Sequence, residues 1–273
     1  MADPVFAQAT SADLERLLRP LLASRTFESR DEVLAVHESE PWRLRVSEAG
    51  DVAVLDTWRD HLDILAVEAL WCAERTIPTA IEQTVSVARE HGFGTVLSPP
   101  VPVDQVHVYE RAGMRVRETT ATLAFELHGR EVVAAPCCEG IIIREGSVGD
   151  IVPVLGGDRR CFDDFWRYDE RRLRRLVERQ RLAIAECEGI PVGYTLSVPG
   201  TEFAQVGRVC VVPEARRQGV GRMLLADVVH AAQRAGARSL GLCTQTGNRA
   251  SHALYHRVGF RDTGDRFVFL ESC

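Results

Sequence analysis

The sequence contains one pattern twice, and this repeat constrains the fold more than any other feature. Residues 109–114 (YERAGM) match residues 255–260 (YHRVGF), and in both copies a helical stretch ends at a glycine that an apolar residue follows. An extended apolar run precedes each copy, at residues 63–67 and 208–212. Such a repeat indicates two successive units of like fold rather than one large domain.

Each half shows the order strand, turn, helix, strand, helix, strand, which predicts two α/β domains. We place the first domain at residues 1–130, a linker at 131–139 and the second domain at 140–273, because Gly129 and Pro136 interrupt the pattern. In the second half the patterns predict strands at 141–144, 182–185, 191–196, 209–212, 239–244 and 267–270, and helices at 163–181, 220–235 and 249–258.

The composition is that of a soluble globular protein. Of the 273 residues, 45% are hydrophobic and 26% are charged, and no run approaches the ~20 apolar residues that span a bilayer. The first residues lack the basic and apolar regions of a signal peptide, so we expect a cytoplasmic protein with no membrane partner. The net charge is −6, and the 33 basic residues, all arginine, are dispersed, which argues against a nucleic-acid partner.

The cysteines do not follow a metal-binding pattern. There are eight of them: Cys72, Cys137, Cys138, Cys161, Cys187, Cys210, Cys243 and Cys273. No two have the C-x-x-C spacing of a zinc site, and in a reducing compartment most cysteines serve as small core residues. We therefore expect no bound metal.

The loop that follows the apolar run of the second half has the features of an anion site. Residues 213–221 read PEARRQGVG. Pro213 ends the strand because it has no N–H for the ladder, and the glycines let the backbone approach a ligand as a helix begins. Free N–H groups of the first helical turn favour an anion, and Arg217 and Arg222 can pair with phosphate. The segment predicts a pyrophosphate cradle.

Two other phosphate-binding motifs do not fit this loop. A P-loop needs Gly-Lys-Ser/Thr, and the chain contains no lysine. A dinucleotide fingerprint needs a third glycine, where Leu224 stands, and an acid about 20 residues later, where residues 241–243 (GLC) offer none. These differences argue against a nucleotide-binding oxidoreductase.

Residues 211–221 (VVPEARRQGVG) resemble the acetyl-CoA motif of the GNAT superfamily of N-acetyltransferases, whose signature is Arg/Gln-x-x-Gly-x-Gly/Ala. Residues 248–260 (NRASHALYHRVGF) resemble the motif that follows it in that family. The resemblance covers residues 206–260. It implies two tandem GNAT-like domains, each a mixed, mostly antiparallel sheet with helices on both faces.

The resemblance also implies roles for individual residues. Backbone groups of Val209, Cys210 and Val211 would pair with the pantetheine arm of acetyl-CoA. The pyrophosphate would be bound by Arg216, Arg217, Gln218, Gly219, Val220, Gly221 and Arg222. Asn248 would bond the pantetheine or pyrophosphate region, and the hydroxyl of Tyr255 would protonate the leaving thiolate. The structural alternatives are a helix N-cap for Asn248 and a core position for Tyr255.

The general base stays open at this point. Family members often carry a glutamate at two strand positions that here hold Gln205 and Cys243. The candidates are Glu202, Asp163, Asp164 and a water chain, with a smaller case for His252 and His256, and the amine could also arrive neutral. Asp163 and Asp164 would suit a cationic amine in the acceptor pocket, and the start of a helix explains them equally well.

The first half carries a degenerate form of the loop. Residues 74–80 read ERTIPTA, and Pro78 stands where the first glycine is expected, so that an N–H that would face phosphate is missing. We predict that this domain keeps the fold, does not bind CoA, and braces or lines the acceptor site, while the retained Tyr109 leaves room for another ligand. A tandem pair with one degenerate half loosely resembles the mycothiol synthases.

These observations predict an acyl-CoA-dependent N-acyltransferase. It would transfer an acetyl or short acyl group from acetyl-CoA or another acyl-CoA to a primary amine of a small molecule or peptide, without a metal. The alternative is a non-catalytic acyl-CoA sensor or adaptor, which the missing carboxylate base and the degenerate first half favour.

Overall fold

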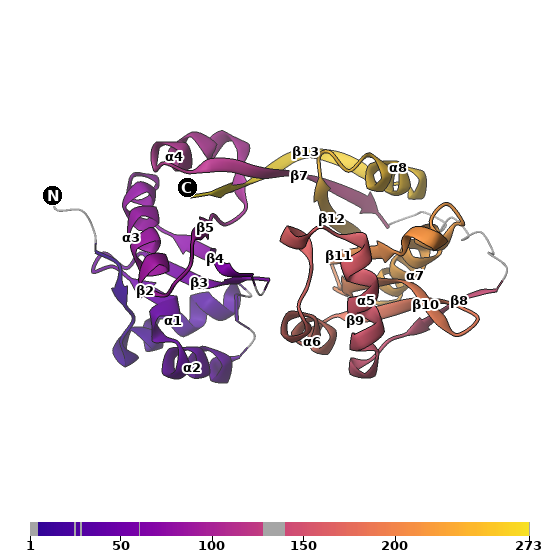
Figure 1. Cartoon of the computed structure of the whole chain (residues 1–273), viewed down its shortest axis with the longest axis horizontal. Helices are drawn as coiled ribbons and strands as arrows, with labels where there is room; N and C mark the ends of the chain where they lie inside the picture. The colour runs from indigo at the N-terminus through magenta and orange to yellow at the C-terminus, as the bar shows by residue number, and fades with distance from the viewer. Residues whose placement is uncertain (1–4, 25, 28, 60, 128–139, 273) are drawn as a thin grey trace. The chain divides into compact units, whose positions relative to one another are not determined.

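The computed structural model describes residues 5–24, 26–27, 29–59, 61–127 and 140–272, and these fall into two compact units (Figure 1). Unit 1 comprises Met1–Thr119 together with Phe267–Cys273, and unit 2 comprises Thr120–Arg266. The linker expected at residues 131–139 lies outside the described residues. None of the described helices is long and apolar enough to cross a membrane.

Unit 1 is built on a mixed sheet with the strand order β1-β2-β3-β4-β5-β13, in which only β4 and β5 are parallel, and β6 pairs with β13. Helices α1 and α2 pack on strands β2 to β4 in one hydrophobic cluster, and α3 and α4 form a second cluster with β3 to β5. The strands are β1 (Ala7–Gln8), β2 (Leu44–Val46), β3 (Val52–Trp58), β4 (His61–Trp71), β5 (Thr95–Leu97), β6 (Val101–Pro102) and the end of β13 (Arg261–Glu271). The helices are α1 (Ser11–Ala23), α2 (Arg30–Ser39), α3 (Ile77–Glu90) and α4 (Val106–Arg111), with 3₁₀ turns η1 (Pro41–Arg43), η2 (Glu74–Thr76) and η3 (Val103–Gln105).

Unit 2 repeats this architecture with the strand order β7-β12-β11-β10-β9-β8, in which only β11 and β12 are parallel. Helices α5 and α6 pack on one face of the sheet, and α7 and α8 pack on the other. The strands are β7 (Arg115–Glu126), β8 (Ile141–Glu145), β9 (Arg181–Cys187), β10 (Ile190–Val198), β11 (Phe203–Val211) and β12 (Ser239–Gln245). The helices are α5 (Ile151–Cys161), α6 (Glu170–Arg179), α7 (Val220–Arg234) and α8 (Arg249–Val258), with 3₁₀ turns η4 (Val148–Asp150), η5 (Asp164–Trp166) and η6 (Pro213–Ala215).

The predicted fold class, two α/β units with mixed and mostly antiparallel sheets, is confirmed. The compact units divide the chain differently from 1–130 and 140–273, because the strand that ends each repeat has residues in both units. Residues 120–126 of β7 pair with β12 in unit 2. Residues 267–271 of β13 belong to unit 1, where Glu271 pairs with Leu97 of β5.

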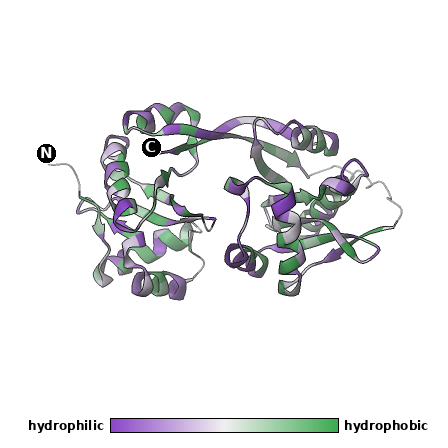
Figure 2. Cartoon of the chain, in the orientation of Figure 1, coloured by the Kyte–Doolittle hydropathy of each residue, from purple (hydrophilic) through white to green (hydrophobic). Residues whose placement is uncertain are grey.

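The helix expected at residues 163–181 is shorter than predicted. Asp163 and Asp169 each begin a separate element, because their side chains accept hydrogen bonds from the N–H groups of Trp166 (3.2 Å) and Arg172 (2.7 Å). These caps divide the segment into η5 and α6. Figure 2 shows α6 almost entirely hydrophilic, and Leu173 is its one buried residue.

The hairpin predicted between β9 and β10 is present and turns at Glu188 and Gly189. Both residues have positive φ, 51° and 78°, as a two-residue type I′ turn requires. This hairpin places β10 beside β11, the strand that leads into the predicted anion loop.

Candidate functional site

Strand β11 leaves its neighbour β12 halfway along its length. Residues 203–206 pair in parallel with residues 239–242. Gly207 is an extra residue in the pairing with β10, a β-bulge, which bends the strand. Beyond the bulge, the only described strand that pairs with β11 is β10, so the other edge of β11 is open beside Val209 and Val211.

The backbone groups of Val209 and Val211 are directed toward this open edge. The N–H of Val212 donates to the carbonyl of Val192 at 3.0 Å, and alternation along an antiparallel pair then turns Val211 and Val209 away from β10. The backbone of Cys210 is directed toward β10 instead, and its side chain is buried in the core. An added strand would therefore find its partners at Val209 and Val211.

One of these backbone groups is already occupied. The Val211 carbonyl accepts hydrogen bonds from the Nε of Arg216 (3.1 Å) and from the Sγ of Cys161 (3.3 Å). A hydrogen bond with Cys210, assisted by the nearby Arg216 charge, lowers the pKa of Cys161 to about 7. The groups left for a ligand are the N–H of Val211 and both polar groups of Val209.

The loop between β11 and α7 contains two residues in the left-handed region. Arg217 has φ 66° and Gly219 has φ 86°. Such a φ is uncommon for a residue other than glycine and often marks a functional segment. Within the described residues no side chain caps α7, so the N–H groups of Val220 and Gly221 are available to an anion at the start of the helix.

The side chains of the loop divide into two groups. Arg216 bonds to the Val211 carbonyl, and Gln218 donates from Nε2 to the carbonyl of Glu214 at 2.9 Å, so these two side chains hold the loop. Arg217 is exposed and Arg222 is half-buried at the start of α7. Neither has an ion-pair partner among the described residues, which leaves two cations next to the anion site.

Gly221 has a packing role that the sequence did not suggest. A Cβ at this position would lie 2.9 Å from Cδ2 of Leu254 in α8. The missing side chain therefore lets α8 pack closely against the first turn of α7. Gly219, with its left-handed φ, is the glycine that the course of the loop requires.

The structure places Asn248 and Tyr255 at opposite ends of α8. The Oδ1 of Asn248 accepts the N–H of Ser251 at 3.1 Å, so Asn248 is the N-cap of the helix. Tyr255 is 7% exposed and packs against Phe260, with ring centroids 5.9 Å apart. Burial raises the pKa of Tyr255 to about 12, against the opposing effects of a Ser251 hydrogen bond and the Arg208 charge. The phenol is therefore protonated near neutral pH and can donate a proton.

The carboxylates considered as general base are all exposed. Asp163 caps η5, and Asp164 forms an ion pair with Arg167. The two histidines of α8 contact backbone carbonyls: Nε2 of His252 lies 3.2 Å from the Gln245 oxygen, and Nδ1 of His256 lies 3.2 Å from the Phe260 oxygen. Gln205, Glu202 and Cys243 are likewise exposed. These contacts do not bring a carboxylate together with Tyr255.

A buried ion pair, which the sequence analysis missed, joins β11 to α5. Asp158 is 0% exposed and Arg208 is 7% exposed. The Nη2 of Arg208 lies 2.7 Å from Oδ1 and 2.8 Å from Oδ2 of Asp158. The hydroxyl of Tyr194 and the N–H of Tyr168 also donate to Asp158. The sequence feature that could have predicted this pair is an arginine within an otherwise apolar strand, because a buried charge needs a partner.

The same arginine organises the segment between α5 and α6. Its guanidinium lies over the rings of Phe162 (3.5 Å) and Tyr168 (4.1 Å) and donates to the Trp166 carbonyl at 2.7 Å. Phe165 and Trp166 are buried, with their rings in an edge-on contact at 5.0 Å. Arg208 thus fixes η5 on the face of the sheet opposite α7.

Comparisons with known proteins agree with this architecture. Residues 155–260 match the acetyltransferase (GNAT) family. A GCN5-related N-acetyltransferase from Sphaerobacter thermophilus is 21% identical, with a TM-score of 0.67 over 100% of this chain and 96% of that chain. A tandem GNAT protein from the clavulanic acid biosynthesis pathway is 18% identical, with a TM-score of 0.65 over 84% of this chain and 81% of that chain. None of the curated proteins matches the sequence. Over its length the chain has the fold of these GNAT proteins, and its match to the acetyltransferase (GNAT) family covers residues 155–260.

Proposed function

We propose that the chain is an acyl-CoA-dependent N-acyltransferase that moves an acetyl or short acyl group to a primary amine of a small molecule or peptide. The observation that carries this proposal is the sequence of three features in unit 2: the open edge of β11, the loop with left-handed Arg217 and Gly219, and the uncapped start of α7. An extended ligand arm that carries amides can pair with the open edge of β11. The diphosphate of the same ligand can bind at the start of α7.

Acetyl-CoA is the donor in this proposal. Val209 and Val211 pair with the pantetheine amides, and the N–H groups of Val220 and Gly221 bind the diphosphate with Arg217 and Arg222. The amine nitrogen attacks the thioester carbonyl, the C–S bond breaks, and Tyr255 donates its proton to the departing sulfur. The proton that the amine loses passes to water, and water returns a proton to the Tyr255 phenolate, so that free CoA and the amide are released and Tyr255 is restored.

Gly219→Glu tests the donor site. The new carboxylate repels the diphosphate, and the left-handed φ of 86° strains any residue with a side chain. We expect acetyl-CoA binding, measured by isothermal titration calorimetry, to fall below detection. Gly156→Glu is the matched control, since that glycine is an exposed residue of α5 with no other atom within 4 Å of an added Cβ. An affinity of Gly219→Glu for acetyl-CoA equal to that of the wild type would contradict the assignment of the donor site.

Tyr255→Phe tests the acid role separately. We expect kcat to fall while the affinity for acetyl-CoA stays within about twofold, because the hydroxyl acts only on the leaving thiolate. CoA thiol release, measured across a panel of small amines and peptide N-termini, gives the rate. An unchanged kcat would remove Tyr255 from the mechanism.

The exposure of every candidate carboxylate favours one alternative, a non-catalytic acyl-CoA sensor. The same thiol-release panel separates the two functions, because a sensor binds acetyl-CoA without turnover of any amine.

We also propose that unit 1 does not bind CoA. Only residues 72–76 separate β4 from α3, whereas residues 212–219 separate β11 from α7, and Pro78 lies in the first turn of α3. Residual acetyl-CoA binding in Gly219→Glu would contradict this.

A further inference from the structure

Two cysteines of unit 2 are in contact where α5 packs on β11 (Figure 1). Cys161 is the last residue of α5 and is half-buried, and Cys210 lies in β11 and is 1% exposed. The thiol of Cys210 donates a hydrogen bond to the sulfur of Cys161, whose own thiol donates to the Val211 carbonyl at 3.3 Å. The pair therefore joins a half-buried cysteine to a buried one.

The ion pair of Asp158 with Arg208 holds the two thiols opposite each other. Asp158 and Cys161 are three residues apart in α5, so they lie on one face of the helix. Arg208 and Cys210 are two residues apart in β11, so they lie on one face of the sheet. The Nη2 of Arg208 lies 2.7 Å from Oδ1 of Asp158, and both side chains are buried. This contact fixes the position of α5 along β11, and with it the place of each thiol.

The two thiols differ in how readily they ionise. The hydrogen bond from Cys210 and the nearby Arg216 guanidinium lower the pKa of Cys161 to about 7. The hydrogen bond to Cys161, together with burial, raises the pKa of Cys210. Because the thiolate is the nucleophile in thiol chemistry, Cys161 is the residue that reacts first with an oxidant. Cys210 is then the thiol in contact with the oxidised sulfur.

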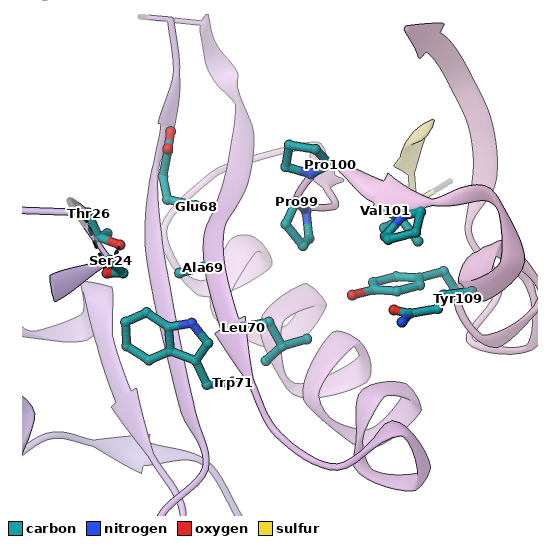
Figure 3. Close-up of a pocket in the computed structure, with 12 residues that line it drawn as sticks. Ser24, Thr26, Glu68, Ala69, Leu70, Trp71, Pro99, Pro100, Val101 and Tyr109 are labelled. Carbon is teal, nitrogen blue, oxygen red and sulfur yellow. Dashed lines mark hydrogen bonds between the residues drawn. The ribbon is translucent and has the colours of Figure 1, made fainter. Parts of the chain in front are cut away.

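At the equivalent position of unit 1, a tryptophan replaces the cysteine of β11. Cys210 is the third residue after the β-bulge at Gly207, and Trp71 is the third residue after the β-bulge at Glu68 of β4. Figure 3 shows Trp71 among the residues that line a cavity of unit 1. An indole cannot form a disulfide, so this thiol pair belongs to the repeat that carries the proposed CoA site.

We propose that Cys161 and Cys210 form an oxidation site, at which hydrogen peroxide converts the two thiols into a disulfide that links α5 to β11. The Cys161 thiolate attacks the peroxide, the O–O bond breaks and hydroxide leaves, so that Cys161 becomes a sulfenic acid. The sulfur of Cys210 then attacks that of Cys161, the S–O bond breaks, and the oxygen leaves as water with the Cys210 proton. The thiols lose two electrons and two protons, and the peroxide becomes two molecules of water.

The disulfide weakens acetyl-CoA binding, an expectation that rests on the proposed function. The bond removes the hydrogen bond of Cys161 to the Val211 carbonyl, and it draws the two sulfurs to about 2 Å, so that β11 shifts beside Val209 and Val211. The backbone groups of these residues are the proposed partners of the pantetheine amides. We expect the oxidised chain to bind acetyl-CoA at least about tenfold more weakly than the reduced chain, and reduction with dithiothreitol to restore the affinity.

Peptide mapping of the full chain after treatment with hydrogen peroxide tests the oxidation site independently of any activity. Trypsin cleaves after arginine and releases Cys161 in residues 161–167 (CFDDFWR) and Cys210 in residues 209–216 (VCVVPEAR). Mass spectrometry should find these two peptides joined, and reduction should separate them. An unmodified Cys161, or a Cys161 peptide joined to that of a different cysteine, would overturn the proposal.

Three variants test the order of the steps. In Cys210→Ala, the sulfenic acid of Cys161 should persist and react with dimedone, because its partner is absent. In Cys161→Ser, which keeps a hydroxyl donor for the Val211 carbonyl, Cys210 should stay reduced because it is buried. Cys187→Ser is the matched control, since it removes another half-buried cysteine of unit 2 and should leave the link unchanged. Oxidation of Cys210 in Cys161→Ser would contradict the role of Cys161.

Calorimetric titration with acetyl-CoA separates this inference from the proposed function. A reduced chain that does not bind acetyl-CoA would refute the proposed function, while the joined peptides would still establish the oxidation site. Joined peptides with an unchanged affinity for acetyl-CoA would refute the effect of the disulfide on β11. Cys161→Ser should keep its affinity for acetyl-CoA after treatment with hydrogen peroxide, and a tenfold loss in this variant would place the sensitive group elsewhere.

Discussion

At the scale of single residues, the pairing of Asp158 with Arg208 couples β11 to the segment that carries η5. Both side chains are buried, and the carboxylate accepts further hydrogen bonds from Tyr194 and Tyr168. Removing one partner of a buried ion pair leaves a charge without compensation, which costs about 3–5 kcal/mol. We expect Asp158→Asn to lower the free energy of unfolding in urea by this amount.

The double variant Asp158→Leu with Arg208→Met should recover part of that loss, since both charges are then absent and apolar side chains fill the space. A loss below about 1 kcal/mol in Asp158→Asn would show that water reaches the pair. Arg208 also bonds the Trp166 carbonyl, so the single variants should loosen η5 as well.

The tyrosines give a second prediction at this scale. Burial raises the pKa of Tyr109 and of Tyr255 to about 12, and it also raises the pKa of Tyr194 well above its ordinary value. Because folding raises these values above the unfolded value near 10, the stability they confer is complete below pH 10 and is lost as the pH rises through 12. Absorbance at 295 nm should show ionisation of at most one of the four tyrosines by pH 10.5. Ionisation of two or more before the loss of circular dichroism would contradict the burial of these phenols.

At the scale of elements, the position of β11 depends on a close approach by β10. A Cβ at Gly193 would lie 2.7 Å from the Cys210 carbonyl and 3.5 Å from the Val211 Cα. Gly193→Ala must therefore displace the backbone of β11, and we expect a loss of about 1–3 kcal/mol in stability together with weaker acetyl-CoA binding. Gly247→Ala is the control, because an added Cβ there has no atom within 4 Å. Equal urea midpoints for the two variants would contradict the close contact.

Several elements of unit 2 were predictable because their local signals agree with the fold. The turn at Glu188 and Gly189, the apolar run of β11 and the 3.6-residue period of α7 each specify one structure. The site was predictable only in part. The buried pair of Arg208 depends on Asp158, a partner that sequence spacing does not reveal, and the packing role of Gly221 depends on Leu254 from another helix.

At the scale of the whole molecule, the repeat predicted two units but could not assign the strand that closes each one. The apolar pattern of β13 is compatible with pairing in either unit. Alternation along a strand indicates which face is buried, but it does not indicate which neighbouring strand forms the backbone hydrogen bonds. In the structure, the last residues of β13 belong to unit 1, where Val268 and Leu270 pack in the hydrophobic cluster of α3 and α4.

This assignment predicts which strands lose hydrogen-exchange protection when a core residue of β13 is substituted. Leu270 is 0% exposed in unit 1 and Leu240 is 0% exposed in unit 2, and Leu→Ala at such positions costs about 2–5 kcal/mol. In hydrogen-exchange mass spectrometry, Leu270→Ala should deprotect β4 and β5, and Leu240→Ala should deprotect β11 and β12. Leu270→Ala should also leave the affinity of unit 2 for acetyl-CoA close to that of the wild type. Deprotection of β11 and β12 by Leu270→Ala, with β4 and β5 unaffected, would instead place the last strand in the second domain, as the continuous division of the chain at residues 131–139 requires.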